Sequence, residues 1–77
     1  MSTKDIRDLR DAEPFQPFDI LLRSGRALHV DWKDAVSFTP SGRHVVVDVG
    51  SAFTFVDVPD VAELKVRPRR FPGASRS

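Results

Sequence analysis

Apolar and polar residues alternate along most of the chain from Phe18 to Val66, which is the period of a half-buried β-strand. The alternation comes in short runs, so it predicts several short strands with one buried face each. The predicted strands lie at residues 18–22, 28–32, 36–39, 44–49, 52–57 and 63–66.

Three glycine-containing dipeptides separate these runs, and each is typical of a tight hairpin turn. They are Ser24-Gly25, Ser41-Gly42 and Gly50-Ser51. Strands joined by tight turns pair antiparallel. The pattern therefore predicts a mainly β fold, a small antiparallel barrel of five or six strands.

The first residues follow a helical pattern instead. Ser2 and Asp5 form a capping box, and Ile6 and Leu9 share one face of a helix that ends near Ala12. So short a helix is not stable alone, and we expect it to dock on the sheet.

The end of the chain changes character at Pro59. Proline is excluded from a central strand, so we expect a single helical turn there, before the last strand. From Arg67 the sequence RPRRFPGASRS has little to bury and predicts a disordered basic tail. The predicted organisation is a single domain at residues 1–66 and a tail at residues 67–77.

The strands at residues 44–49 and 52–57 carry apolar residues on both faces, so both faces need cover. On the buried face we place Val45, Val47, Val49, Phe53 and Phe55. The apolar residues left for the outward face are Val46, Val56 and Val58. We expect this outward surface to be an interface between copies of the chain.

Length and composition favour association as well. With 77 residues and no cysteine, the chain has a small core and no disulfide to reinforce it. No apolar run approaches the ~20 residues that span a bilayer, so no membrane partner is expected. The absence of cysteine agrees with a reducing compartment, and we expect a cytoplasmic location.

The net charge of +1 hides an asymmetry along the chain. Residues 1–64 hold seven Lys/Arg and eleven Asp/Glu, a balance of −4, whereas residues 65–77 hold five cations and no acid. A basic tail on an acidic body can contact phosphate, screen the charge of its own domain, or simply keep a disordered end solvated.

Two resemblances follow from the order of these segments. The stretch EPFQPFDILLRSGRALHV resembles the opening of a family of small uncharacterised bacterial proteins, with a P-F-x-P-F-x-I-x-L segment and a G-R turn. The order of helix, bent meander, single turn and closing strand, ending in VDVPDVAELKV, resembles SH3-like barrels and the Sm-like family that includes the bacterial RNA chaperone of the Hfq type.

The Sm-like resemblance implies an RNA-binding ring, but it transfers no binding residue. Where the Hfq-type family has a Tyr-Lys-His segment between its last two strands, this chain has Val58-Pro59-Asp60, which supplies no cation. The hairpin at residues 35–49 is also longer than the bacterial pattern.

Candidates for catalysis are few. His29 and His44 lie on the outward phase of their strands, with Asp31 and Asp48 close behind them in the sequence. These residue types can bind a first-row metal, but their spacing is typical of solvated strand positions. We expect no enzyme activity, cofactor, metal or small-molecule substrate.

The sequence thus favours a non-catalytic assembly module over an Sm-like or SH3-like RNA-binding module. RNA binding would be weak and would use arginines at the hairpin turns and in the tail. Trp32 lies either in the core or at its rim, or it is a stacking platform for bases. The candidate arginines are Arg23, Arg26, Arg43, Arg67, Arg69 and Arg70.

Overall fold

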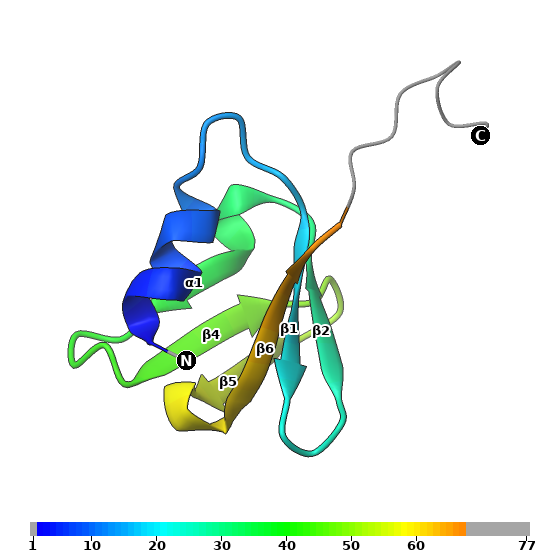
Figure 1. Ribbon diagram of the computed structural model, residues 1–77. Coiled ribbons are helices and arrows are strands. Elements are labelled where there is room, and N and C mark those ends of the chain that lie inside the picture. Colours follow the sequence, from blue (N-terminus) through cyan, green and yellow to red (C-terminus); the bar gives the residue numbers. More distant parts are fainter. Residues whose placement is uncertain (1, 68–77) are drawn as a thin grey trace.

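The computed structural model describes residues 2–67, which form six strands in two antiparallel sheets and one α-helix (Figure 1). The first sheet has the strand order β2-β1-β6 and the second the order β3-β4-β5. The first contains β1 (Phe18–Leu22), β2 (Ala27–Val30) and β6 (Val61–Val66). The second contains β3 (Val36–Phe38), β4 (His44–Asp48) and β5 (Phe53–Asp57).

Two single-turn 3-10 helices carry the chain between the sheets. The first, η1 (Lys33–Ala35), joins β2 to β3, and the second, η2 (Val58–Asp60), joins β5 to β6. Within residues 2–67, no strand ladder crosses either junction. The mainly β prediction with antiparallel strands and an N-terminal helix is confirmed, but in place of the predicted barrel the described strands form two sheets.

The core lies between the two sheets and consists entirely of apolar side chains. Every strand contributes at least one of them. In β1, β2 and β4, buried residues alternate with more exposed ones, as the sequence predicted. The buried residues are Ile6, Phe18, Ile20, Leu28, Val30, Ala35, Val36, Val45, Val47, Val56, Val58 and Val61.

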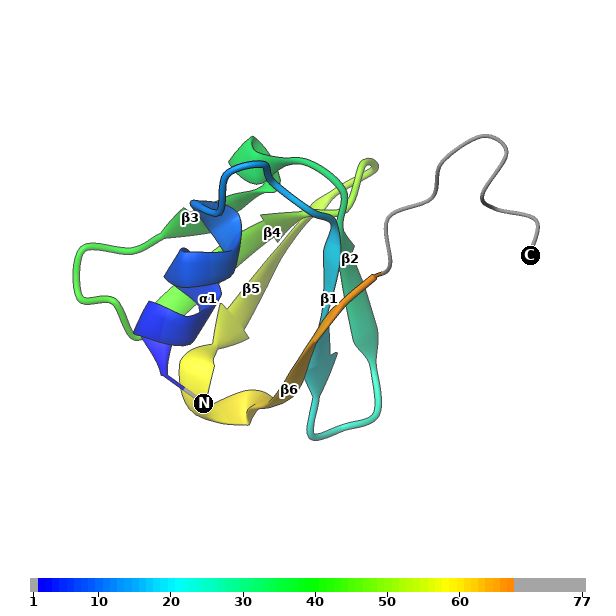
Figure 2. The same ribbon diagram turned by 45° about the horizontal axis from the view of Figure 1, so that its top comes forward.

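The helix α1 (Thr3–Arg10) lies on the side of the molecule formed by β3 and β4 (Figure 2). The predicted capping box is confirmed, because the Ser2 hydroxyl accepts from the Asp5 amide and the Asp5 carboxylate accepts from the Ser2 amide. Ile6 is fully buried, and the Thr3 hydroxyl donates to the Gly42 carbonyl oxygen. The helix is therefore docked on the rest of the domain, as its length requires.

Two ion pairs involve residues of α1, one between Lys4 and Asp8 and one between Arg10 and Asp11. The hydrogen bond to Asp8 raises the pKa of Lys4, and the hydrogen bond from Arg10 lowers the pKa of the Asp11 carboxyl. Ion pairs at such exposed positions add little to stability. The helix is thus held mainly by Ile6 and by its contacts with the sheet.

The hairpin between β4 and β5 overturns the predicted phase of β5. Val49 donates its amide to the Ala52 carbonyl oxygen, and this closes a two-residue turn at Gly50-Ser51. The ladder then places Val45 opposite Val56. Because directly paired residues share a face, Val56 joins the core, and the prediction that Phe53 and Phe55 are buried is wrong. Val49, also expected on the buried face, is 38% exposed where the strand enters the turn.

The predicted end of the domain also shifts by one residue. The Arg67 amide donates to the Pro17 carbonyl oxygen at 3.0 Å and so continues the β1–β6 pairing. Arg67 therefore belongs to the folded domain and not to a tail. The rest of the predicted tail, with Arg69 and Arg70, lies outside the described residues.

Candidate interaction surface

The most prominent surface feature is an apolar patch on the outward face of β4 and β5, which we call the Phe53/Phe55 face. Phe53 and Phe55 expose 72% and 71% of their surface, and Val46, directly opposite Phe55, is half-buried. An exposed large apolar cluster is the informative exception on a protein surface, because scattered single apolar residues are normal. The Phe53/Phe55 face is thus suited to contact another molecule.

Polar side chains surround this face. Asp48 pairs opposite Phe53, Ser37 pairs opposite Val46, and at the end of the ladder His44 Nε2 lies 2.6 Å from Asp57 Oδ1. An apolar centre within a polar rim is the usual anatomy of a protein interface.

Of the three residues expected on the outward surface of this hairpin, the structure places one there. Val46 does lie on the outward face, as expected. Val56 and Val58 were expected beside it, but they are 3% and 6% exposed and belong to the core. Phe53 and Phe55 take their place on the surface.

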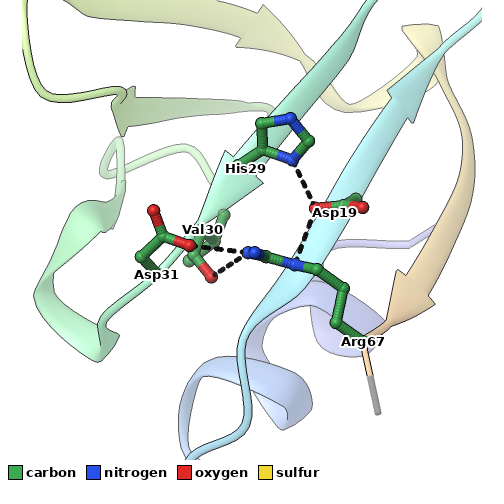
Figure 3. Close-up of polar contacts among 5 residues, drawn as sticks. All are labelled: Asp19, His29, Val30, Asp31 and Arg67. Atoms are coloured by element: carbon green, nitrogen blue, oxygen red, sulfur yellow. Dashed lines mark hydrogen bonds and ion pairs between the residues drawn. The ribbon is translucent and has the colours of Figure 1, made fainter. Parts of the chain in front are cut away.

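A second cluster is built around Arg67 and ties the end of β6 to β1 and β2 (Figure 3). One terminal nitrogen of the guanidinium donates to Asp31 Oδ1 at 2.7 Å and to the Val30 carbonyl oxygen at 3.3 Å. Its Nε lies 3.1 Å from Asp19 Oδ1, an ion pair without hydrogen-bond alignment. His29 Nδ1 contacts the same Asp19 oxygen at 2.7 Å. This cluster fixes three strands and leaves Arg67 engaged by two carboxylates.

A shallow pocket of about 240 Å³ lies beside this cluster. Trp32, which is 44% exposed, forms part of its wall, so the indole sits at a rim and not in the core. The pocket is lined by Arg26, Ala27, Leu28, His29, Asp31, Trp32, Asp48 and Val49. Because the pocket has one guanidinium and two carboxylates, its charges select neither a cationic nor an anionic ligand.

The arginines predicted to bind RNA do not all converge. Arg23 donates its Nε to the Pro59 carbonyl oxygen, and Arg43 lines a small pocket that also includes Pro59. Arg23 and Arg43 therefore flank η2 at the same end of the molecule. Arg26 instead lines the Trp32 pocket, and Arg67 is held by Asp19 and Asp31.

The two histidines do not share a site. His29 pairs with Asp19 in the first sheet and His44 with Asp57 in the second. Within residues 2–67, no three His, Asp or Glu side chains are grouped as metal ligands. Over the same residues, α1 is too short and too polar to cross a bilayer, and no other helix qualifies.

Comparison with known proteins gives no relatives. No family model matches the chain, and neither a curated protein nor a solved structure matches it. The functional argument therefore depends on the surfaces described above.

Proposed function

We propose that the protein is a non-catalytic module that self-associates through the Phe53/Phe55 face. The observation that carries this proposal is the pair of phenylalanines, each more than two-thirds exposed, on neighbouring outward positions of one strand. Half-buried Val46 extends the patch onto β4. Phenylalanine is among the residues that are enriched at protein interfaces relative to the rest of the surface.

The architecture supports the same proposal. A chain of this size has a small core and gains stability readily when copies bury surface on one another. Association and folding are then linked, so the melting temperature rises with protein concentration.

The test compares two variants by light scattering after size-exclusion chromatography. We expect the wild-type chain to elute as an oligomer at micromolar concentration and Phe53→Ser/Phe55→Ser to shift towards monomer. Val66→Ser is the matched control, because Val66 is 44% exposed on the other sheet. A wild-type monomer at every concentration would contradict the proposal.

We further propose that the two sheets are an opened form of the SH3-like or Sm-like barrel. In support, a helix precedes the meander, and a single 3-10 turn leads into a last strand that returns to β1. This assignment concerns the fold and assigns no ligand.

RNA binding is the second candidate, and the exposure of Phe53 and Phe55 favours it. Two outward aromatic side chains on a strand offer a stacking surface for unpaired bases, with Arg43 at the far end of the same hairpin. Against it, Asp48 and Asp57 rim the same face. Repulsion between these carboxylates and phosphate should weaken binding.

Salt distinguishes RNA binding from self-association, because it affects the two affinities differently. Binding of single-stranded RNA weakens with a slope of about −0.7 in log–log form per phosphate contact. Association through phenylalanines is insensitive to salt or strengthened by it. A titration with fluorescent oligouridine at two salt concentrations, using wild type and Arg43→Ala, separates them. Tight binding that Arg43→Ala abolishes would favour the RNA module.

A further inference from the structure

We infer that two copies of the chain pair edge to edge through β5, antiparallel, about a two-fold axis at Thr54. The inference rests on the proposed self-association and specifies its partner and geometry. The two second sheets, each of three strands, would then join into one continuous sheet.

The free edge of β5 provides the backbone groups for this pairing. Among the described strands, β5 pairs only with β4. The hydrogen bonds from the Val49 amide to Ala52 and from the Val58 amide to Arg43 fix which residues face β4. Because the pattern alternates along an antiparallel ladder, Thr54 and Val56 point their amides and carbonyls towards β4, whereas Phe53, Phe55 and Asp57 point theirs away. The residues with exposed rings thus also carry the unpaired backbone groups.

The other three sheet edges are less suitable. The β6 edge has two exposed charged side chains, Glu63 and Lys65, and a register shift. Charges and irregularities of this kind discourage pairing with another strand. On the β3 edge, the Phe38 ring is covered by Arg7 and Arg10 of α1. The β2 strand has only four residues and exposes none of its large apolar side chains. β5 combines exposed aromatic residues with an uncharged stretch from Phe53 to Val56.

The register follows from matching side chains across the two-fold axis. Pairing about Thr54 places Phe53 opposite the second copy's Phe55, and the reverse, so both aromatic pairs form on the same outward face. Val46 then extends each pair into a row of three apolar side chains, because it lies opposite Phe55 within its own chain. Pairing about Phe55 would instead place Asp57 opposite a phenylalanine.

The buried area is compatible with a dimer. At ~200 Å² for each fully exposed ring, the four phenylalanines with 72% and 71% exposure contribute at most roughly 550 Å². Specific interfaces start at about 1,200 Å² in total. The rings therefore supply less than half, and backbone and flanking residues of both β5 edges must supply the rest.

Cysteine cross-linking tests the geometry directly, since the chain has no cysteine of its own. In the proposed register Thr54 faces its own counterpart at a non-hydrogen-bonded position, where Cα atoms are ~4.5 Å apart and a disulfide is feasible. We expect Thr54→Cys to form a covalent dimer of twice the chain mass under mild oxidation. Ser37→Cys, exposed on the β3 edge, is the matched control and should stay monomeric on a non-reducing gel.

A second measurement tests the same register without Thr54→Cys, in case that variant does not fold. Phe53→Cys and Phe55→Cys are mixed, and a disulfide should join the two variants to each other faster than either variant to itself. If both variants and wild type are monomeric by light scattering, the proposed self-association fails together with this inference. If wild type is oligomeric but neither Thr54→Cys nor the mixture cross-links, the pairing through β5 is wrong and self-association remains.

Discussion

Val45 lies directly opposite Val56 in the β4–β5 ladder, and both side chains are buried in the core. We therefore predict that Val56→Ala lowers the free energy of unfolding by about 2 kcal/mol, from lost burial and the cavity left behind. Val46→Ala, on the other face of the hairpin, should change it by less than ~0.5 kcal/mol in the monomer. Urea unfolding at low protein concentration measures both.

Equal effects of the two substitutions would contradict the phase of β5. A larger loss from Val46→Ala that grows with protein concentration would instead reflect its part in the interface.

Part of this hairpin was predictable from the sequence. The two-residue turn at Gly50-Ser51 sets Val49 opposite Ala52, and counting back along both strands sets Val45 opposite Val56. Once Val45 is assigned to the core, the turn alone requires Val56 inside and Phe55 outside. The hydrophobic pattern alone led us to place Phe53 and Phe55 inside, and the register reverses that assignment.

The turn itself provides the next prediction. Gly50 has φ +98, a backbone conformation that side-chain-bearing residues rarely adopt, although no atom lies near the site of an added Cβ. Gly50→Ala should therefore cost about 1–2 kcal/mol from backbone strain alone. Thermal unfolding would show this loss, whereas Ser51→Ala in the same turn should leave stability unchanged. An unchanged Gly50→Ala would mean that the turn relaxes to another type.

Arg67 should be a stabilising residue although it is the last one described. Its guanidinium meets Asp31, the Val30 carbonyl oxygen and the mostly buried Asp19. Hydrogen bonds to charged groups contribute about 1.5–3 kcal/mol, and with the Arg67 side chain 37% exposed we expect Arg67→Ala to cost ~1–2 kcal/mol. Denaturant unfolding is the measurement.

Arg26→Ala is the matched control, because Arg26 is exposed and forms no ion pair with the described residues. Arg67→Lys should recover only part of the loss, since an ammonium group lacks the fork that reaches both carboxylates. If Arg67→Ala and Arg26→Ala behave alike, the Arg67 cluster is not stabilising.

The Arg67 cluster was beyond sequence reasoning for a physical reason. Asp19 and His29 read as the polar positions of two separate strands, and Arg67 as the first residue of a basic tail. The local β1–β2 hairpin places Asp19 opposite His29, but only the pairing of β6 with β1 brings Arg67 to them, and that pairing depends on contacts between opposite ends of the sequence. By contrast, the capping box and the hairpin turns are local, and the sequence was sufficient for them.

Phe38 gives a further test of how α1 is held. The guanidinium carbons of Arg7 and Arg10 lie 4.7 and 4.9 Å from the centre of its ring. Each cation–π contact is worth about 0.5–1 kcal/mol at an exposed site, so Arg7→Gln/Arg10→Gln should lose ~1–2 kcal/mol in total. In a Phe38→Leu background the same double substitution should cost much less.

Lys4→Gln is the control on the same helix, because Lys4 pairs with Asp8 and is not among the cations over Phe38. A loss that is the same with Phe38 and with leucine would assign the effect to helix propensity or to Asp11, and not to the ring.

The return of β6 to β1 has a consequence for synthesis. The second sheet is assembled from neighbouring segments, whereas the first receives its third strand only after Val61–Val66 has emerged from the ribosome. Until then one edge of β1 lacks its partner strand, and long-range pairing of this kind is slow to form. A nascent chain paused before β6 therefore displays both the unpaired β1 edge and the Phe53/Phe55 face, two features that a chaperone can bind.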